Sequence, residues 1–169
     1  EGRTGSPKET VQELEVMFGK MMTIIADLST KVMTELDSHL LVCPQGTRSK
    51  RLTPGKTGMV QMAQKMGAII VPVGCNGTDK IYPGGSPFAK RGKVVYRIGE
   101  PVNVLDPQFE EFRVPPDIVP FSREANATYG ARYQALTDIV MDRINNLLDP
   151  EYQYGEDEDG TSGQVQRFV

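Results

Sequence analysis

The sequence predicts an α/β fold in which a largely parallel or mixed sheet is flanked by helices. Two amphipathic segments, at 7–36 and 126–148, have the apolar spacing of helices. Three short apolar runs, at 39–43, 68–73 and 94–98, have the character of strands. The chain of 169 residues is 38% hydrophobic, so it can bury one ordinary core, and one domain is expected.

The first helix is expected to begin at Ser6 and to end near Leu36. Ser6 can accept a hydrogen bond from a backbone amide of the first turn, Pro7 suits the first helical position, and Glu9 can complete a capping box. Apolar residues then recur at alternating spacings of three and four: Val11, Leu14, Phe18, Met21, Ile25, Leu28 and Val32. Lipid or a partner helix could cover this methionine-rich stripe, but we expect it to pack on the chain's own sheet.

The next three elements predict a βαβ unit. The run at 39–43 is expected to be a buried strand, 57–66 a helix that ends at Gly67, and 68–73 a second strand. Such a unit pairs its strands in parallel through a right-handed crossover. Pro72 lacks an N–H, which suits an edge strand or the end of a strand.

The later segments complete the predicted domain. Residues 101–120 carry five prolines and are expected to form an extended covering loop before the last helix, which Pro150 terminates. We expect residues 1–154 to form a partial domain that lacks its N-terminal block, and residues 155–169, which are acidic and poor in apolar residues, to be a disordered tail. The chain begins at Glu1 without a signal-peptide pattern, so it is expected to be a piece of a longer protein.

Composition excludes several classes of protein. A net charge of −3 and a pI near 5.3 argue against a general nucleic-acid binder. No apolar run approaches the roughly 20 residues that span a bilayer. Cys43 and Cys75 are too far apart for a C-x-x-C pair, and with one histidine, His39, the chain offers no zinc set, so no metal site is expected. The cysteines are expected to be small core residues in a reducing compartment.

The segment after the first predicted strand has the chemistry of an anion site. In open α/β sheets ligands bind beyond the carboxyl ends of the strands, which is where residues 44–49 are expected to lie. Gly46 permits close backbone approach, Thr47 offers a hydroxyl, and Arg48 offers a planar fork that matches phosphate oxygens. Further cations follow: Lys50, Arg51 and Lys56. We predict a phosphate or carboxylate site, the alternative being a solvated basic connection.

A nucleotide-binding loop is the competing interpretation of the same segment. Gly55-Lys56-Thr57 matches the end of the pattern G-x-x-x-x-G-K-[ST], which requires glycine at position 50. This chain has Lys50 there, and without that glycine the backbone amides do not close around a β-phosphate in the usual way. A nucleotide hydrolase is therefore disfavoured.

Four blocks in this order resemble the glycerolipid acyltransferase family, typified by 1-acylglycerol-3-phosphate acyltransferases. The similarity runs from about Leu40 to Tyr152. The blocks are PQGTRS at 44–49, VPVG at 71–74, KVVYRIGEPV at 93–102 and the closing segment at 136–152. The resemblance implies a glycerol-3-phosphate acyltransferase-like fold and the transfer of a fatty acyl group from acyl-CoA or acyl carrier protein to the free hydroxyl of a lysophospholipid in phospholipid biosynthesis. It implies a membrane surface as partner, a location on the cytoplasmic face, peripheral or anchored from outside this chain, no cofactor beyond the acyl donor, and no nucleic acid.

The resemblance also implies roles for individual residues. Arg48 would bind the acceptor phosphate, Gly46 would shape the turn, Thr47 would support it, and Gln45 stands where the family usually has glutamate. Arg3 is expected to end an earlier block that places a basic residue near the same phosphate.

The catalytic pair of the family is missing from this chain. Family members use His-x-x-x-x-Asp, in which the histidine removes the hydroxyl proton and the aspartate orients it. The position five residues after His39 is Pro44, so the pair is expected upstream of Glu1, and no residue of this chain is assigned to catalysis. This chain alone is expected to be inactive. The alternative is a non-catalytic phosphate- or lipid-binding relative of the same fold.

Overall fold

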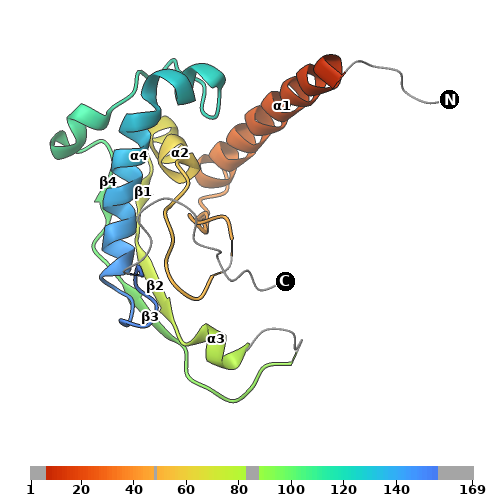
Figure 1. Cartoon of the computed structure of the whole chain (residues 1–169). Helices are drawn as coiled ribbons and strands as arrows, with labels where there is room; N and C mark the ends of the chain where they lie inside the picture. The colour runs from red at the N-terminus through yellow and green to blue at the C-terminus, as the bar shows by residue number, and fades with distance from the viewer. Residues whose placement is uncertain (1–6, 48, 83–87, 156–169) are drawn as a thin grey trace.

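The computed structural model of the chain describes residues 7–47, 49–82 and 88–155. Figure 1 shows a long first helix projecting from a body in which a second long helix lies along paired strands. The elements in chain order are α1 (Pro7–Thr34), α2 (Gly58–Met66), β1 (Ile69–Ile70), β2 (Val73–Asn76), α3 (Thr78–Ile81), β3 (Val95–Ile98), β4 (Val102–Asn103), the 3₁₀ helix η1 (Pro107–Phe112) and α4 (Arg123–Asn145).

The core forms where α2 and η1 pack on α4. The Ser122 hydroxyl caps α4 by accepting from the Ala125 N–H, and the helix then buries one apolar face. Helices α2 and α4 confirm the predictions, and Gly67 ends α2 in the left-handed conformation at φ 64°. The predicted covering loop at 101–120 contains β4 and η1. The buried core residues are Val60, Ala63, Val102, Val104, Phe109, Ala125, Tyr133, Leu136 and Val140.

Strand pairing differs from the prediction. Among the described residues both ladders are antiparallel: β1 pairs with β4 and β2 with β3. The α/β class is confirmed, but no parallel sheet is observed. Pro72 divides the predicted strand at 68–73 into β1 and β2, because it has no N–H for the ladder. Its carbonyl accepts from the Gly99 N–H at 2.9 Å. The strand predicted at 94–98 is confirmed as β3.

The predicted strand at 39–43 is wrong. These residues form a coil between α1 and the loop that follows, and Leu41 is 94% exposed. An apolar run becomes a strand only when a neighbouring strand supplies hydrogen-bond partners, and β2 is paired with β3 instead. Cys43, expected in the core, is exposed for the same reason, whereas Cys75 on β2 is half-buried.

The β2–β3 ladder has one covered face and one open face. Gly74 and Asn76 are buried beneath the segment that follows α4. On the opposite face the register places Val73 beside Ile98 and Cys75 beside Tyr96. The side chains of Tyr96 and Ile98 on this face are exposed. The sheet therefore contributes only one of its two faces to the core.

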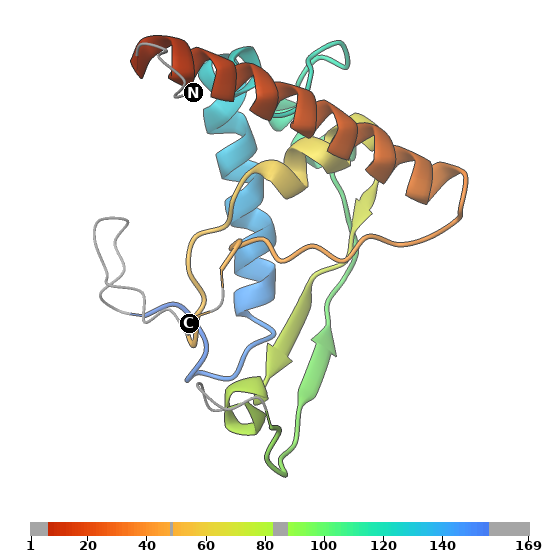
Figure 2. The same cartoon turned by 90° about the vertical axis from the view of Figure 1, so that its right-hand side faces the viewer.

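Helix α1 confirms the predicted helix but not its packing. Its predicted apolar stripe does not lie on the sheet, and Figure 2 shows α1 crossing the body with only its C-terminal half beside α2. Val32, at the end of the predicted stripe, is partly buried, but most of the other partly buried side chains belong to another stripe, which includes Met22, Ala26, Ser29 and Met33. No helix within the described ranges is long and apolar enough to cross a membrane. The tail predicted at 155–169 lies outside the described residues except for Gly155, so its disorder stays a prediction.

A substitution at Gly74 tests the contact between β2 and the segment after α4. A Cβ at Gly74 would lie 2.6 Å from the Leu147 Cβ and 2.8 Å from its carbonyl oxygen, which is backbone and cannot move aside. We expect Gly74→Ala to lower the free energy of unfolding by about 1–3 kcal/mol through overpacking. Urea unfolding measures the change.

Gly130→Ala is the matched control. Nothing lies within 4 Å of a Cβ at Gly130, which is inside α4. The same chemical change there should stabilise the protein by up to about 1 kcal/mol, because alanine is the better helix former. Equal effects at the two glycines would contradict the described packing.

Candidate anion-binding loop

Residues 44–56, which we call the anion loop, form a closed loop between the coil after α1 and the start of α2. The Lys56 N–H donates to the Pro44 carbonyl at 2.8 Å, which joins the two ends. The Gly46 N–H donates to the Cys43 carbonyl at 3.1 Å, and Gly46 has φ +67°, a left-handed conformation that favours glycine. The turn that begins the loop therefore depends on Gly46.

The side chain of Gln45 holds the loop together from within. Its Nε2 donates to the Ser49 Oγ at 3.0 Å and to the Thr53 Oγ1 at 2.8 Å. The Ser49 hydroxyl in turn donates to the Arg51 carbonyl at 2.6 Å. A glutamate at position 45 has no N–H to donate, so this pattern uses the amide that distinguishes the chain from the usual family sequence. Sequence reasoning missed Thr53, whose partner is eight residues away.

The far side of the loop is fixed to α4 and to the segment that follows it. The Leu52 N–H donates to the Tyr152 carbonyl at 2.8 Å, and Leu52 is buried. Gly55 is also buried, and a Cβ there would lie 2.7 Å from the Met141 Cγ and 2.8 Å from the Thr137 Cγ2. The loop thus rests on the body through one face and exposes the other.

The exposed side of the anion loop carries the positive charge. Lys50, Arg51 and Lys56 are exposed, and the stem of Lys56 lies beside Gly46. Arg51 donates to the Gln153 carbonyl at 3.3 Å, so part of its fork is used structurally. The ion pairs found within 7–47, 49–82 and 88–155 lie elsewhere, and in those ranges Lys50 and Lys56 have no carboxylate partner. Their charge is available to an anion.

Two of the predicted site residues cannot be located. Arg3 and Arg48 lie outside the described residues. Of the other three, Thr47 is exposed, Gly46 shapes the turn, and Gln45 faces into the loop. The structure therefore brings Gln45, Gly46 and Thr47 together next to Lys56.

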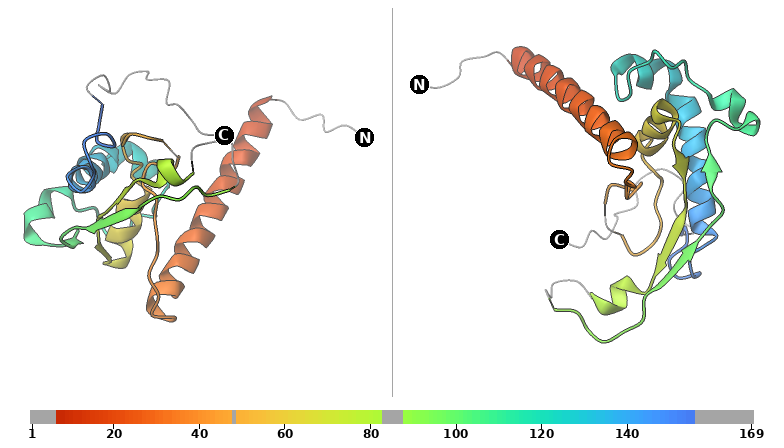
Figure 3. Two further views of the ribbon diagram at one scale, coloured as in Figure 1. Left: turned by 90° about the horizontal axis from the view of Figure 1, so that it is seen from below. Right: turned by 180° about the vertical axis from the view of Figure 1, so that it is seen from behind.

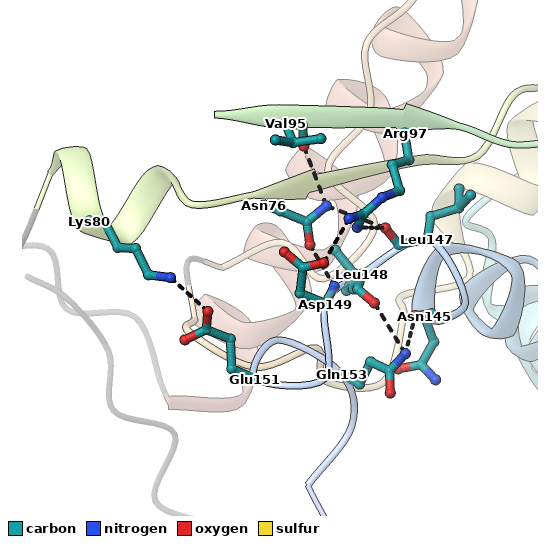
Figure 4. A network of polar contacts seen from close by, with 10 residues as sticks. All are labelled: Asn76, Lys80, Val95, Arg97, Asn145, Leu147, Leu148, Asp149, Glu151 and Gln153. Carbon is teal, nitrogen blue, oxygen red and sulfur yellow. Dashed lines mark hydrogen bonds and ion pairs between the residues drawn. The ribbon is translucent and has the colours of Figure 1, made fainter. Parts of the chain in front are cut away.

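A polar network around Asn76 positions the segment that holds the loop (Figure 4). The Asn76 side chain is 2% exposed; its Nδ2 donates to the Val95 and Leu147 carbonyls, both at 3.3 Å, and its Oδ1 accepts from the Asp149 N–H at 2.7 Å. Arg97 donates to the Leu147 carbonyl at 2.9 Å and pairs with Asp149 at 2.7 Å. These bonds connect the end of β2 to residues 147–149.

A second set of bonds continues this segment to Tyr152. The Tyr152 hydroxyl donates to Asp79 at 2.6 Å, and Lys80 pairs with Glu151 at 2.7 Å. Burial, with the Asp79 carboxylate as a further cause, raises the pKa of the Tyr152 hydroxyl, so it stays protonated and donates at neutral pH. Asp79 thereby holds Tyr152, whose carbonyl accepts from the Leu52 N–H.

Among the described residues the site contains no histidine–aspartate pair for acyl transfer. His39 is exposed in the coil before the loop, and Pro44 occupies the position where the family pair would have its aspartate. Across the described residues no group of three or more histidine, cysteine, aspartate or glutamate side chains could hold a metal ion.

Comparison with known proteins bears on this region. The family model described as Acyltransferase matches residues 15–76, which run from α1 through the anion loop to the end of β2. The match agrees with the resemblance to acyltransferases predicted from the ordered blocks, and it supports acyl transfer as the general chemistry. No match was found among curated proteins or among solved structures.

Alkaline pH tests the packing of the segment that holds the loop. Burial, and then the carboxylates of Asp142 and Asp138, raises the pKa of Tyr154 to about 12. Because the ordinary value is about 10, folding opposes ionisation of this hydroxyl, and stability is lost as the pH rises from about 10 through 12. Tyr154→Phe should reduce the loss of unfolding free energy at high pH by on the order of 1–2 kcal/mol.

Urea unfolding of the parent and of Tyr154→Phe at a series of pH values measures the difference. The two free energies of unfolding should keep a constant offset at neutral pH and converge or cross in favour of the phenylalanine variant above pH 10. Parallel curves up to pH 12 would show that Tyr154 is not held in a buried, anionic environment.

Proposed function

We propose that this chain carries the phosphate-binding part of an acyltransferase that moves a fatty acyl group from acyl-CoA or acyl carrier protein to the free hydroxyl of a lysophospholipid such as 1-acylglycerol-3-phosphate. The observation that carries the proposal is the closed cationic loop inside the region matched by the acyltransferase family model. Phospholipid biosynthesis is the process in which this reaction serves, and no cofactor beyond the acyl donor is required.

The loop supplies the groups that a phosphate monoester needs. Arg48 gives a planar fork for two phosphate oxygens, and Thr47 gives a hydroxyl donor. Gln45 keeps the loop closed without adding a negative charge, because it uses a neutral amide. Lys50 and Lys56 raise the local potential, and Arg3 completes the cationic set. In this assignment the side chains bind the acceptor, and none performs the proton transfer.

The chemical step requires a histidine–aspartate pair, and the sequence of these 169 residues has no His-x-x-x-x-Asp. In acyl transfer the acceptor hydroxyl loses its proton, its oxygen bonds to the thioester carbonyl carbon, and the carbon–sulfur bond breaks to release the thiol, which takes up a proton. His39 has no aspartate five residues later. The histidine–aspartate pair is therefore proposed to come from outside this chain, with the reaction on the cytoplasmic face of the membrane.

A non-catalytic lipid- or phosphate-binding relative is the second candidate. It is favoured by one observation, the missing pair, and it uses the same loop for the same headgroup. The two candidates differ in whether the full-length protein transfers an acyl group, so an acyl-transfer assay on that protein separates them.

Binding to the isolated chain tests the role of Arg48. We expect 1-acylglycerol-3-phosphate to bind more tightly than the corresponding monoacylglycerol, which has no phosphate. Arg48→Ala should cost about 1.5–3 kcal/mol of binding free energy, because a hydrogen bond to a charged group is lost. Titration calorimetry below the critical micelle concentration gives both affinities.

Arg91→Ala is the matched control, since Arg91 is exposed on the connection that leads to β3, away from the anion loop in sequence. It should leave the affinity unchanged within error. Equal affinity for the phosphorylated and unphosphorylated lipids, or no effect of Arg48→Ala, would remove the loop from the acceptor site.

An activity assay tests the placement of the base. The 169-residue chain should release no thiol from acyl-CoA above the rate of an acceptor-free blank, and His39→Ala should change nothing. Acyl transfer by this chain that survives His39→Ala would show that a different group performs the proton transfer. Acyl transfer that His39→Ala abolishes would make His39 the base and contradict the proposal that the base comes from outside this chain.

A further inference from the structure

Helix α1 presents an apolar stripe that the rest of the described chain leaves uncovered. Six large side chains of this stripe are between 42% and 56% exposed. We call them the α1 seam: Val11, Leu14, Phe18, Met21, Ile25 and Leu28. Because the side that is partly buried is a different stripe, which includes Met22, Ala26 and Met33, the seam stays free while α1 keeps its place in the fold.

The spacing of the seam is that of a coiled coil. The six residues follow at three, four, three, four and three positions, so the pattern repeats every seven residues, which keeps a stripe facing one partner helix along its whole length. In heptad terms Val11, Phe18 and Ile25 occupy a positions, and the d positions begin with Leu14. Two of the three a positions are β-branched, with Phe18 as the third, and two of the three d positions are leucine, with Met21 as the third. Of the known combinations this is nearest to the one that favours two helices over three or four.

The area available fits a stable pair. Met17 and Ile24 flank the seam and are 61% and 58% exposed. A half-exposed side chain of this size leaves on the order of 100 Å² open, so the eight residues together offer roughly 800 Å² per chain. That is about the share that each partner contributes to an interface of standard size. The seam holds no charged side chain, so burying it desolvates no ion.

The charges of α1 argue against a lipid surface as the occupant. A helix that lies on an anionic membrane carries mainly lysine and arginine on its polar side. Here Glu13 and Asp27 accompany Lys20 and Lys31, so the polar side has no cationic excess to attract headgroups. A helix with a mixed-charge polar side and an apolar stripe is typical of one that faces solvent on the polar side and packs on another helix along the stripe.

From these observations we infer that the α1 seam pairs with the same seam of a second copy of this chain, as a two-stranded coiled coil. The seam is self-complementary because each copy offers the same run of large and β-branched side chains. Figure 3 shows α1 extending past the body of the molecule in both views, so its N-terminal half is open to a second helix. This inference does not depend on the proposed function.

Sedimentation velocity on the 169-residue chain over a range of concentrations tests the pairing. Reducing agent is present throughout, because Cys43 is exposed and could otherwise form an intermolecular disulfide. We expect a concentration-dependent dimer. Ile25→Glu, which puts a charge into the seam, should raise the dimer dissociation constant at least tenfold, and Phe18→Ala should raise it without adding charge.

Thr23→Glu is the matched control, since Thr23 is an exposed residue of α1 outside the seam, two positions from Ile25. It should leave the dimer intact. At concentrations where the parent is also monomeric, thermal unfolding of the variants should match that of the parent, because the seam lies outside the core. A parent chain that is monomeric at all concentrations, or equal effects of Ile25→Glu and Thr23→Glu, would overturn the inference.

Vesicle flotation tests whether lipid, and not a second copy of the chain, covers the seam. With vesicles of phosphatidylcholine and phosphatidylglycerol, any flotation of the parent should be unchanged by Ile25→Glu. Flotation that Ile25→Glu abolishes would assign the seam to lipid. Slow amide hydrogen exchange along α1 in a monomeric parent chain would instead show that the seam packs within its own molecule, and either result would contradict the pairing.

Discussion

The buried side chain of Asn76 is the contact on which the position of the candidate site depends. It stands at the end of β2, donates to the Val95 and Leu147 carbonyls and accepts from the Asp149 N–H, and Arg97 donates to the same Leu147 carbonyl. Those bonds fix Leu147 and Asp149 against the sheet. From there the chain reaches Tyr152, whose carbonyl holds Leu52 of the anion loop. The anion loop is thus connected to β2 through this network, in addition to its own contacts with α4.

The electrostatics of the anion loop follow from how it is closed. Its closure uses backbone groups, hydroxyls and the neutral Gln45 amide, and no carboxylate takes part among the described residues. The charges of Lys50 and Lys56 are therefore not neutralised locally, and they add to the potential at the turn that Gly46 forms. An ion pair inside the loop would have offered the same rigidity with less attraction for an anion.

Local signals in the sequence predicted the elements whose stabilising contacts are local. Gly67 ends α2, and the predicted helices α1 and α4 form, because each depends on residues a few positions away. The same is true of the glycine turn at Gly46. The resemblance to acyltransferases could also be recognised from the sequence, because it rests on four sequence blocks in a fixed order.

What the sequence could not predict depends on distant partners. The run at 39–43 has the composition of a strand, but no strand edge receives it, and it remains a coil. The stripe on α1 correctly indicated an amphipathic helix without indicating which surface would cover it. Thr53 and Asp79 became visible as contributors only in three dimensions, because their roles come from bonds to Gln45 and to Tyr152.

Hydrogen–deuterium exchange with and without 1-acylglycerol-3-phosphate tests the central claim most directly, because it locates the headgroup without altering any residue. The account predicts that the lipid slows exchange in peptides covering 44–56 and leaves β3 unchanged, and that the matching monoacylglycerol slows neither. Protection that appears elsewhere, or that the unphosphorylated lipid produces equally well, would contradict a phosphate site in this loop.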